Sequence, residues 1–68
     1  MIQNNFSVII AKKRLKISTI HRATGISRTT LTKLYYDDIH MINLEVIDKL
    51  CKFLDCKLED IFTYQEED

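Results

Sequence analysis

Hydrophobic residues recur along this chain at the three- and four-residue spacing of an α-helix. The clearest case is residues 44–54, where apolar side chains fill one half of a helical wheel and charged side chains fill the other. Shorter patterns of the same kind precede it, and Leu58, Ile61 and Phe62 add one more helical turn after it. The predicted helices cover about residues 6–13, 17–24, 27–36, 44–54 and 58–62. The pattern therefore predicts an all-α fold with five helices.

Residues at the predicted helix starts are of types that favour helix capping. Asn5 and Asn43 stand where an N-cap side chain accepts a bond from the first turn, and the second helix starts at Ser18 or the backbone before it. Residues 63–64 predict a short strand that pairs with residues 1–3. The expected architecture is thus five helices with a short β pairing between the two ends of the chain.

The stretch from Thr24 to Leu31 predicts a sharp turn that runs into a helix. Gly25 is the single glycine of the chain, which suits a backbone position with positive φ, and Ser27 is a suitable N-cap. In the following helix Leu31 and Leu34 face one side, the predicted core. The outward positions are Thr29, Thr32, Lys33 and Tyr36. This surface offers donors, acceptors and a cation without a carboxylate, as expected of a helix that contacts phosphates and base edges of DNA.

Length and composition allow one small domain. The 68 residues contain no proline and 46% hydrophobic residues, so we expect a single domain over 1–68, with the helix-turn-helix at about 17–36 and an acidic tail at 63–68. The longest apolar run, Val8 to Ala11, is too short for a membrane span or a signal peptide. We expect a cytoplasmic protein.

Charge is strongly segregated although the formal net charge is zero. Residues 1–34 contain seven Lys and Arg and no acid, whereas residues 35–68 contain ten Asp and Glu against three Lys. A basic half joined to an acidic half indicates a polyanionic partner on one side and repulsion of that partner on the other. The alternative is a solvated surface that happens to be asymmetric.

The chain lacks a recognisable catalytic or metal-binding constellation. Its two cysteines and two histidines are not spaced as a zinc knuckle, and we expect both thiols to be reduced. No serine has an evident His and acid partner, and there is no Gly-rich phosphate loop. We therefore expect neither an enzyme nor a cofactor. The residues weighed for zinc are Cys51, Cys56, His21 and His40.

Three segments together resemble the Cro/cI (XRE) class of helix-turn-helix regulators, especially its small single-domain members in bacteria and phages. The first runs from Ile20 through the turn glycine and Ser27 to the spaced leucines that end at Leu34. The other two are residues 47–54 and 58–62. This resemblance implies a lambda repressor-like domain that binds double-stranded DNA, with helix 27–36 in the major groove.

The resemblance also implies which residues contact DNA. Its base-reading positions correspond to Arg28, Thr29, Thr32 and Lys33. Its phosphate contacts correspond to Ile17, Ser18, Ser27, Tyr36 and His40. Two positions depart from the family pattern: His21 stands where alanine is usual, and Lys16 stands where a capping Ser or Thr is common. If a small residue suffices at position 21, His21→Ala should be neutral or stabilising.

Two function hypotheses follow. The first is a sequence-specific regulator of transcription, most simply a repressor that blocks polymerase by occupying a promoter. It would act as a homodimer, because one recognition helix reads only a few base pairs. The second is a protein-interaction module, such as an antitoxin or phage effector, that binds a protein partner through its acidic half. The apolar dimer candidates are Val46, Phe53, Phe62 and Tyr64.

Overall fold

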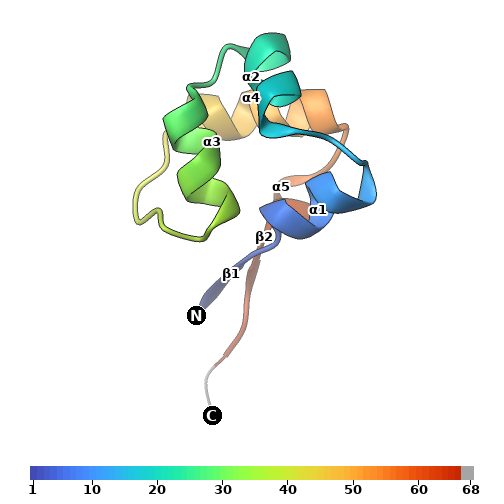
Figure 1. The fold of residues 1–68 in the computed structure, drawn as a ribbon. Coiled ribbons are helices and arrows are strands. Elements are labelled where there is room, and N and C mark those ends of the chain that lie inside the picture. The colour runs from blue at the N-terminus through green and yellow to red at the C-terminus, as the bar shows by residue number, and fades with distance from the viewer. Residues whose placement is uncertain (67–68) are drawn as a thin grey trace.

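The computed structural model describes residues 1–66 as five helices with a two-stranded sheet at one end (Figure 1). In chain order the elements are β1 (Ile2–Asn4), α1 (Phe6–Lys12), α2 (Ile17–Thr24), α3 (Arg28–Tyr35), α4 (Leu44–Leu54), α5 (Leu58–Ile61) and β2 (Phe62–Tyr64). The five predicted helices and the terminal pairing are confirmed, with boundaries shifted by one residue or so. Glu67 and Asp68 of the predicted acidic tail lie outside the described residues.

The core is a single cluster to which every helix contributes. It holds nine buried hydrophobic residues, and burying a side chain of this size stabilises the fold by about 2 kcal/mol relative to exposing it. The buried residues are Phe6, Ile10, Ile20, Ile26, Leu31, Leu34, Leu50, Leu54 and Ile61. One of these, Ile26, lies outside the helices, in the turn between α2 and α3. This turn is therefore part of the core rather than a surface loop.

Helix starts are capped as predicted at α3 and α4, but differently at α1. Ser27 Oγ accepts a bond from the Thr30 amide at 3.1 Å, and Asn43 Oδ1 accepts one from the Glu45 amide at 2.7 Å. Asn5 occupies the N-cap position of α1 without a side-chain cap bond. Asn4 Oδ1 instead accepts from the Phe6 amide at 2.9 Å. The cap assigned to Asn5 is thus wrong by one residue.

The two strands pair antiparallel, with Ile2 opposite Tyr64 and Asn4 opposite Phe62. Asn4 also connects this sheet to α3. Its Nδ2 donates to the carbonyl of Leu34 at 2.8 Å and to Asp37 Oδ1 at 3.3 Å. The sheet is therefore fastened to the C-terminal end of α3.

The amphipathic pattern of α4 predicts one position wrongly. Leu44 belongs to the apolar half of the wheel, yet it is 79% exposed. An apolar arc is buried only where another element crosses it, and no element among residues 1–66 covers Leu44 in the first turn of α4. Leu58, at the first turn of α5, is likewise 52% exposed. None of the helices described in residues 1–66 is long and apolar enough to cross a membrane.

Backbone conformation at Gly25 gives a first testable prediction. Its φ is +78°, and a Cβ built there would meet no atom within 4 Å, so any penalty comes from the backbone alone. We expect Gly25→Ala to lower the free energy of unfolding by about 1–2 kcal/mol in chemical denaturation. Asp55→Gly, at another left-handed residue (φ 52°), should leave that free energy unchanged or raise it. Equal stability of Gly25→Ala and the wild type would contradict this account.

Candidate nucleic-acid interface

The turn between α2 and α3 brings the two helices together at a buried residue. Gly25 ends α2 in the left-handed conformation, with its amide bonded to the His21 carbonyl at 2.8 Å. Ile26 follows with its side chain 4% exposed. Ser27 then caps α3. Three consecutive residues thus reverse the chain, fill the space between the helices and start α3.

The buried face of α3 determines which side chains face outward. Leu31 and Leu34 are completely buried, and Asn4 from β1 holds the Leu34 carbonyl. All four predicted base-reading residues are exposed: Arg28, Thr29, Thr32 and Lys33. Helical spacing places them on the side away from the core, so the structure brings them together on one surface.

This surface has the chemistry needed to contact DNA bases. α3 contains no acidic residue between its ends at Arg28 and Tyr35. An arginine fork can donate to O6 and N7 of one guanine, and threonine can contact a thymine methyl group or donate its hydroxyl. The outward side of α3, formed by the four base-reading residues, is called the reading surface below.

The predicted phosphate-contacting residues lie on three separate segments. Ile17 and Ser18 begin α2, which has no side-chain cap, and the Ile17 side chain packs against the core. A contact from Ile17 would have to come from its amide. The Ser27 hydroxyl is already used, because it accepts from the Thr30 amide and donates to Thr30 Oγ1 at 2.9 Å. Tyr36 is 71% exposed after α3, beside Tyr35 in an edge-to-face pair.

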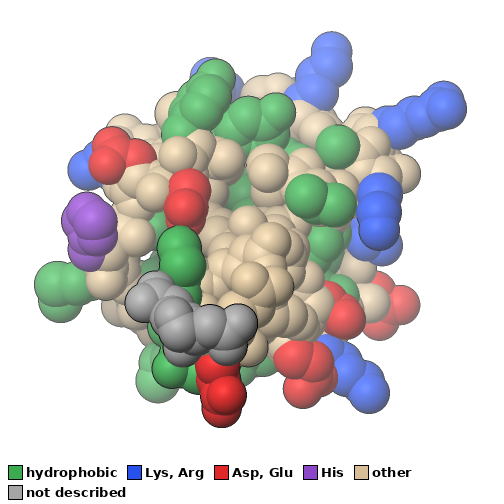
Figure 2. All heavy atoms as spheres, turned by 90° about the horizontal axis from the view of Figure 1, so that it is seen from below, with side chains coloured by type: hydrophobic (Ala, Val, Ile, Leu, Met, Phe, Trp, Pro, Cys, Tyr) green, Lys and Arg blue, Asp and Glu red, His purple; other side chains and the backbone are tan. Residues whose placement is uncertain are grey.

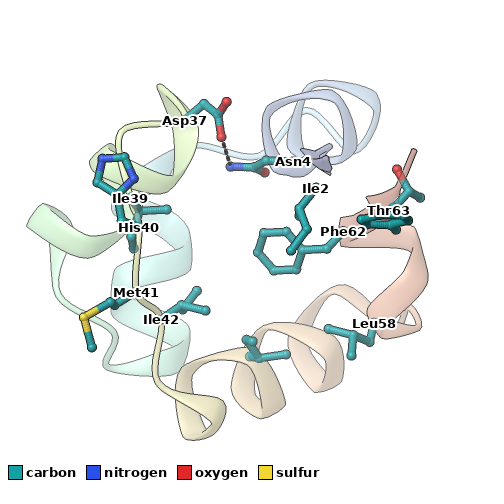
Figure 3. A pocket seen from close by; sticks show the side chains of 12 residues that line it. Ile2, Asn4, Asp37, Ile39, His40, Met41, Ile42, Leu58, Phe62 and Thr63 are labelled. Atoms are coloured by element: carbon teal, nitrogen blue, oxygen red, sulfur yellow. Dashed lines mark hydrogen bonds between the residues drawn. The ribbon is translucent and has the colours of Figure 1, made fainter. Parts of the chain in front are cut away.

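His40, unlike the other predicted phosphate contacts, lines an apolar groove near the sheet. This groove has a volume of about 550 Å³ and lies between β1, β2, α4, α5 and the loop after α3 (Figure 3). Its apolar lining includes Ile2, Ile39, Met41, Ile42, Phe62 and Tyr64. Acidic side chains are spread around apolar surface on the face seen in Figure 2. The sequence pattern did not predict this groove, because its walls come from segments far apart in the chain.

The four dimer candidates do not form one patch. Phe62 and Tyr64 line the groove, and Tyr64 is 72% exposed. Val46 lies at a separate small cleft beside Gly25 and Ser27. Phe53 is half-buried against the core. Met41, at 87% exposed, is a groove residue that sequence reasoning did not select.

The two cysteines are free and half-buried. Burial raises the pKa of the Cys56 thiol, and the neighbouring Cys51 and Asp60 raise it further. Within residues 1–66 no three His, Cys, Asp or Glu side chains come close enough to hold a metal ion.

His21 is more than a packing residue. Its ring is half-buried, and Nδ1 lies 2.7 Å from the carbonyl oxygen of Ile26. Because a carbonyl only accepts, Nδ1 carries the proton that forms this bond. The prediction that His21→Ala is neutral or stabilising does not take account of this bond, whose loss leaves a partly buried carbonyl without its partner.

Comparison with known proteins agrees with this geometry. The family model described as a Cro/C1-type HTH DNA-binding domain matches residues 5–67. The chain is also similar to the uncharacterized HTH-type transcriptional regulator YozG of Bacillus subtilis (strain 168). The two are 27% identical over 64 residues, which is 94% of this chain and 76% of that protein.

The cap of α3 gives a second prediction. Ser27→Ala removes the acceptor of the Thr30 amide and should lower the free energy of unfolding by about 1 kcal/mol. Ser18→Ala is the matched control, since Ser18 lies in the first turn of α2 and forms no cap there. Urea denaturation of both variants measures the difference. If Ser27→Ala loses no more free energy of unfolding than Ser18→Ala, the Ser27 cap does not stabilise the start of α3.

Proposed function

The chain belongs to the family of Cro/C1-type helix-turn-helix DNA-binding domains, and from this premise we propose that it regulates transcription by reading a specific double-stranded DNA sequence. The observation that carries the proposal is the reading surface of α3, which presents Arg28, Thr29, Thr32 and Lys33 and no acid. In this proposal α3 enters the major groove and α2 crosses above the DNA backbone.

Phosphate contacts would position the reading surface without selecting a sequence. The amides at the start of α2, at Ile17 and Ser18, point where the helix dipole favours an anion. Ser27 would contribute through its amide, since its hydroxyl caps α3, and Tyr36 through its exposed phenol. His40 is the weakest of these assignments because it lies at the apolar groove.

Repression is the simplest regulatory outcome of such binding. A domain that occupies a promoter blocks polymerase without needing any further contact. The charge distribution supports a fixed orientation, because the acidic half of the chain is repelled by the same DNA that attracts the basic half. Such a repressor would act in the cytoplasm of a bacterial cell, where its DNA lies.

A homodimer would double the length of DNA that is read. Two copies related by a twofold axis would read a palindrome with half-sites about 34 Å apart. The groove supports this assembly, because Ile2, Met41 and Tyr64 expose large apolar side chains around it. The groove also contains an acid, Asp37, and an imidazole, His40. In a symmetric pair, Asp37 of one copy could face His40 of the other, and the reverse.

A protein-binding role is the second candidate, and the same groove favours it. An apolar groove beside acidic side chains could receive an apolar segment that carries basic residues. If the wild-type protein bound no DNA duplex, this result would favour the protein-binding role instead.

Substitution of Arg28 tests the reading surface. We expect Arg28→Ala to weaken binding to the preferred site by about 1–3 kcal/mol and to abolish preference at one base pair, with far less effect on random DNA. A contact to phosphate alone would instead weaken binding on every sequence and lower the salt slope by about one. Titration of both duplexes at two salt concentrations separates these outcomes. Lys12→Ala, at the end of α1, is the control and should show neither effect.

Sedimentation tests the homodimer. We expect the wild type to sediment as a dimer at micromolar concentration or on its DNA, and Met41→Lys to shift it to the monomer, because a charge would be buried in the apolar contact. Val8→Lys is a matched control at another exposed apolar residue, on α1 and outside the groove lining. A wild-type protein that stays monomeric both free and on DNA would exclude this assembly.

A further inference from the structure

Both backbone polar groups of Ile26 are held by side chains of α2. The carbonyl oxygen accepts from His21 Nδ1 at 2.7 Å, and the amide donates to Thr24 Oγ1 at 3.2 Å. The Thr24 hydroxyl uses its own proton in a bond to the Ile20 carbonyl at 2.7 Å, so it is free to accept from Ile26. The residue just before the cap of α3 is thus bound on both sides by one helix.

We propose that His21 and Thr24 form a side-chain clasp that sets the orientation of α3 relative to α2 and so positions the reading surface. The functional half of this inference rests on the proposed reading of DNA. The clasp acts one residue before Ser27, where a small backbone rotation would swing the whole of α3. Both residues are positioning residues, because neither lies on the reading surface.

The buried side chain of Ile26 cannot fix this orientation alone. Apolar packing is non-directional, so it does not by itself specify how the peptide groups of Ile26 are oriented. Two hydrogen bonds, one from the Ile26 amide and one to its carbonyl, restrain the orientation of these peptide groups. The amide of Gly25, bonded to the His21 carbonyl, holds the preceding residue to the same helix.

The clasp predicts which ring nitrogen of His21 carries the proton, and this prediction can be tested without DNA. A neutral His21 must carry its proton on Nδ1, leaving Nε2 as an acceptor. In the neutral ring Nδ1–H is bonded to Ile26 and Nε2 can only accept, so neither nitrogen is left to donate to a phosphate. His40 is an internal reference, since it forms no hydrogen bond with any residue in 1–66 and should show no such restriction.

Long-range proton–nitrogen NMR spectra of the labelled protein test this half of the inference. At a pH where both rings are neutral, established by titration in the same spectra, we expect the Nδ1–H form for His21 and a mixture of tautomers for His40. An Nε2–H form at His21 would overturn the clasp. Because this measurement uses only the wild type, it stands even if a variant does not fold.

Paired substitutions test positioning. His21→Ala removes the donor, whereas His21→Asn places an amide nitrogen near the position of Nδ1. Thr24→Val removes the hydroxyl at nearly constant volume, whereas Thr24→Ser retains it. In residual dipolar couplings of the free protein, we expect the amides of α3 to reorient relative to α2 in the first variant of each pair and to return toward wild-type values in the second.

Affinity for DNA gives the functional readout. We expect His21→Ala and Thr24→Val to bind the preferred duplex about 3- to 10-fold more weakly when fully folded, with random duplexes little affected and with recovery in His21→Asn and Thr24→Ser. Unchanged couplings together with unchanged affinity of the folded variants would reduce the clasp to a stabilising contact and overturn the proposal. If the wild type bound no duplex, the proposed function would fail, while the tautomer and the couplings would still decide the clasp.

Discussion

Burial of Leu31 and Leu34 is the constraint on which the rest of the structure depends. These two side chains fix the rotation of α3 about its own axis, and every other residue of that helix is placed as a consequence. The turn before α3 and the Asn4 bond after it then hold its two ends. A helix of this length has marginal stability alone, so its orientation comes from the core that it helps to form.

Long-range electrostatics complement this local packing. Packing determines which face of α3 points outward, whereas the separation of bases and acids along the chain determines how the molecule approaches a polyanion. The two effects act over different distances. Packing operates at contact, and the charge asymmetry acts over about 10 Å at moderate salt before it is screened.

Much of the fold followed from the sequence because its signals are local. Gly25 and Ser27 specify a turn and a cap within a few residues, and the leucine spacing in α3 assigns its faces. Two features that depend on distant contacts were not predicted. The burial of Leu44 depends on whether another element crosses the first turn of α4, and the groove exists only after both ends of the chain meet near α4.

In the candidate site too, local features were predicted and features that depend on distant contacts were not. The exposed set on α3 follows from helical periodicity, whereas the bond from His21 to Ile26 depends on how two helices cross. An unusual residue at position 21 was visible in the sequence. Its partner was not, because a backbone carbonyl carries no sequence signal.

The pairing of β1 with β2 has a consequence for the order of events in folding. It joins residues about 60 positions apart, as at Gln3 opposite Thr63, so its loop-closure entropy is among the largest in the chain. The contacts of α2 with α3 and α4 close shorter loops, so we expect them to form before the sheet. The Asn4 bond to the Leu34 carbonyl spans 30 positions but needs β1 in place, so we expect the sheet to stabilise the C-terminal end of α3 when it closes. The packing of α2, α3 and α4 would then precede the ordering of the C-terminal end of α3.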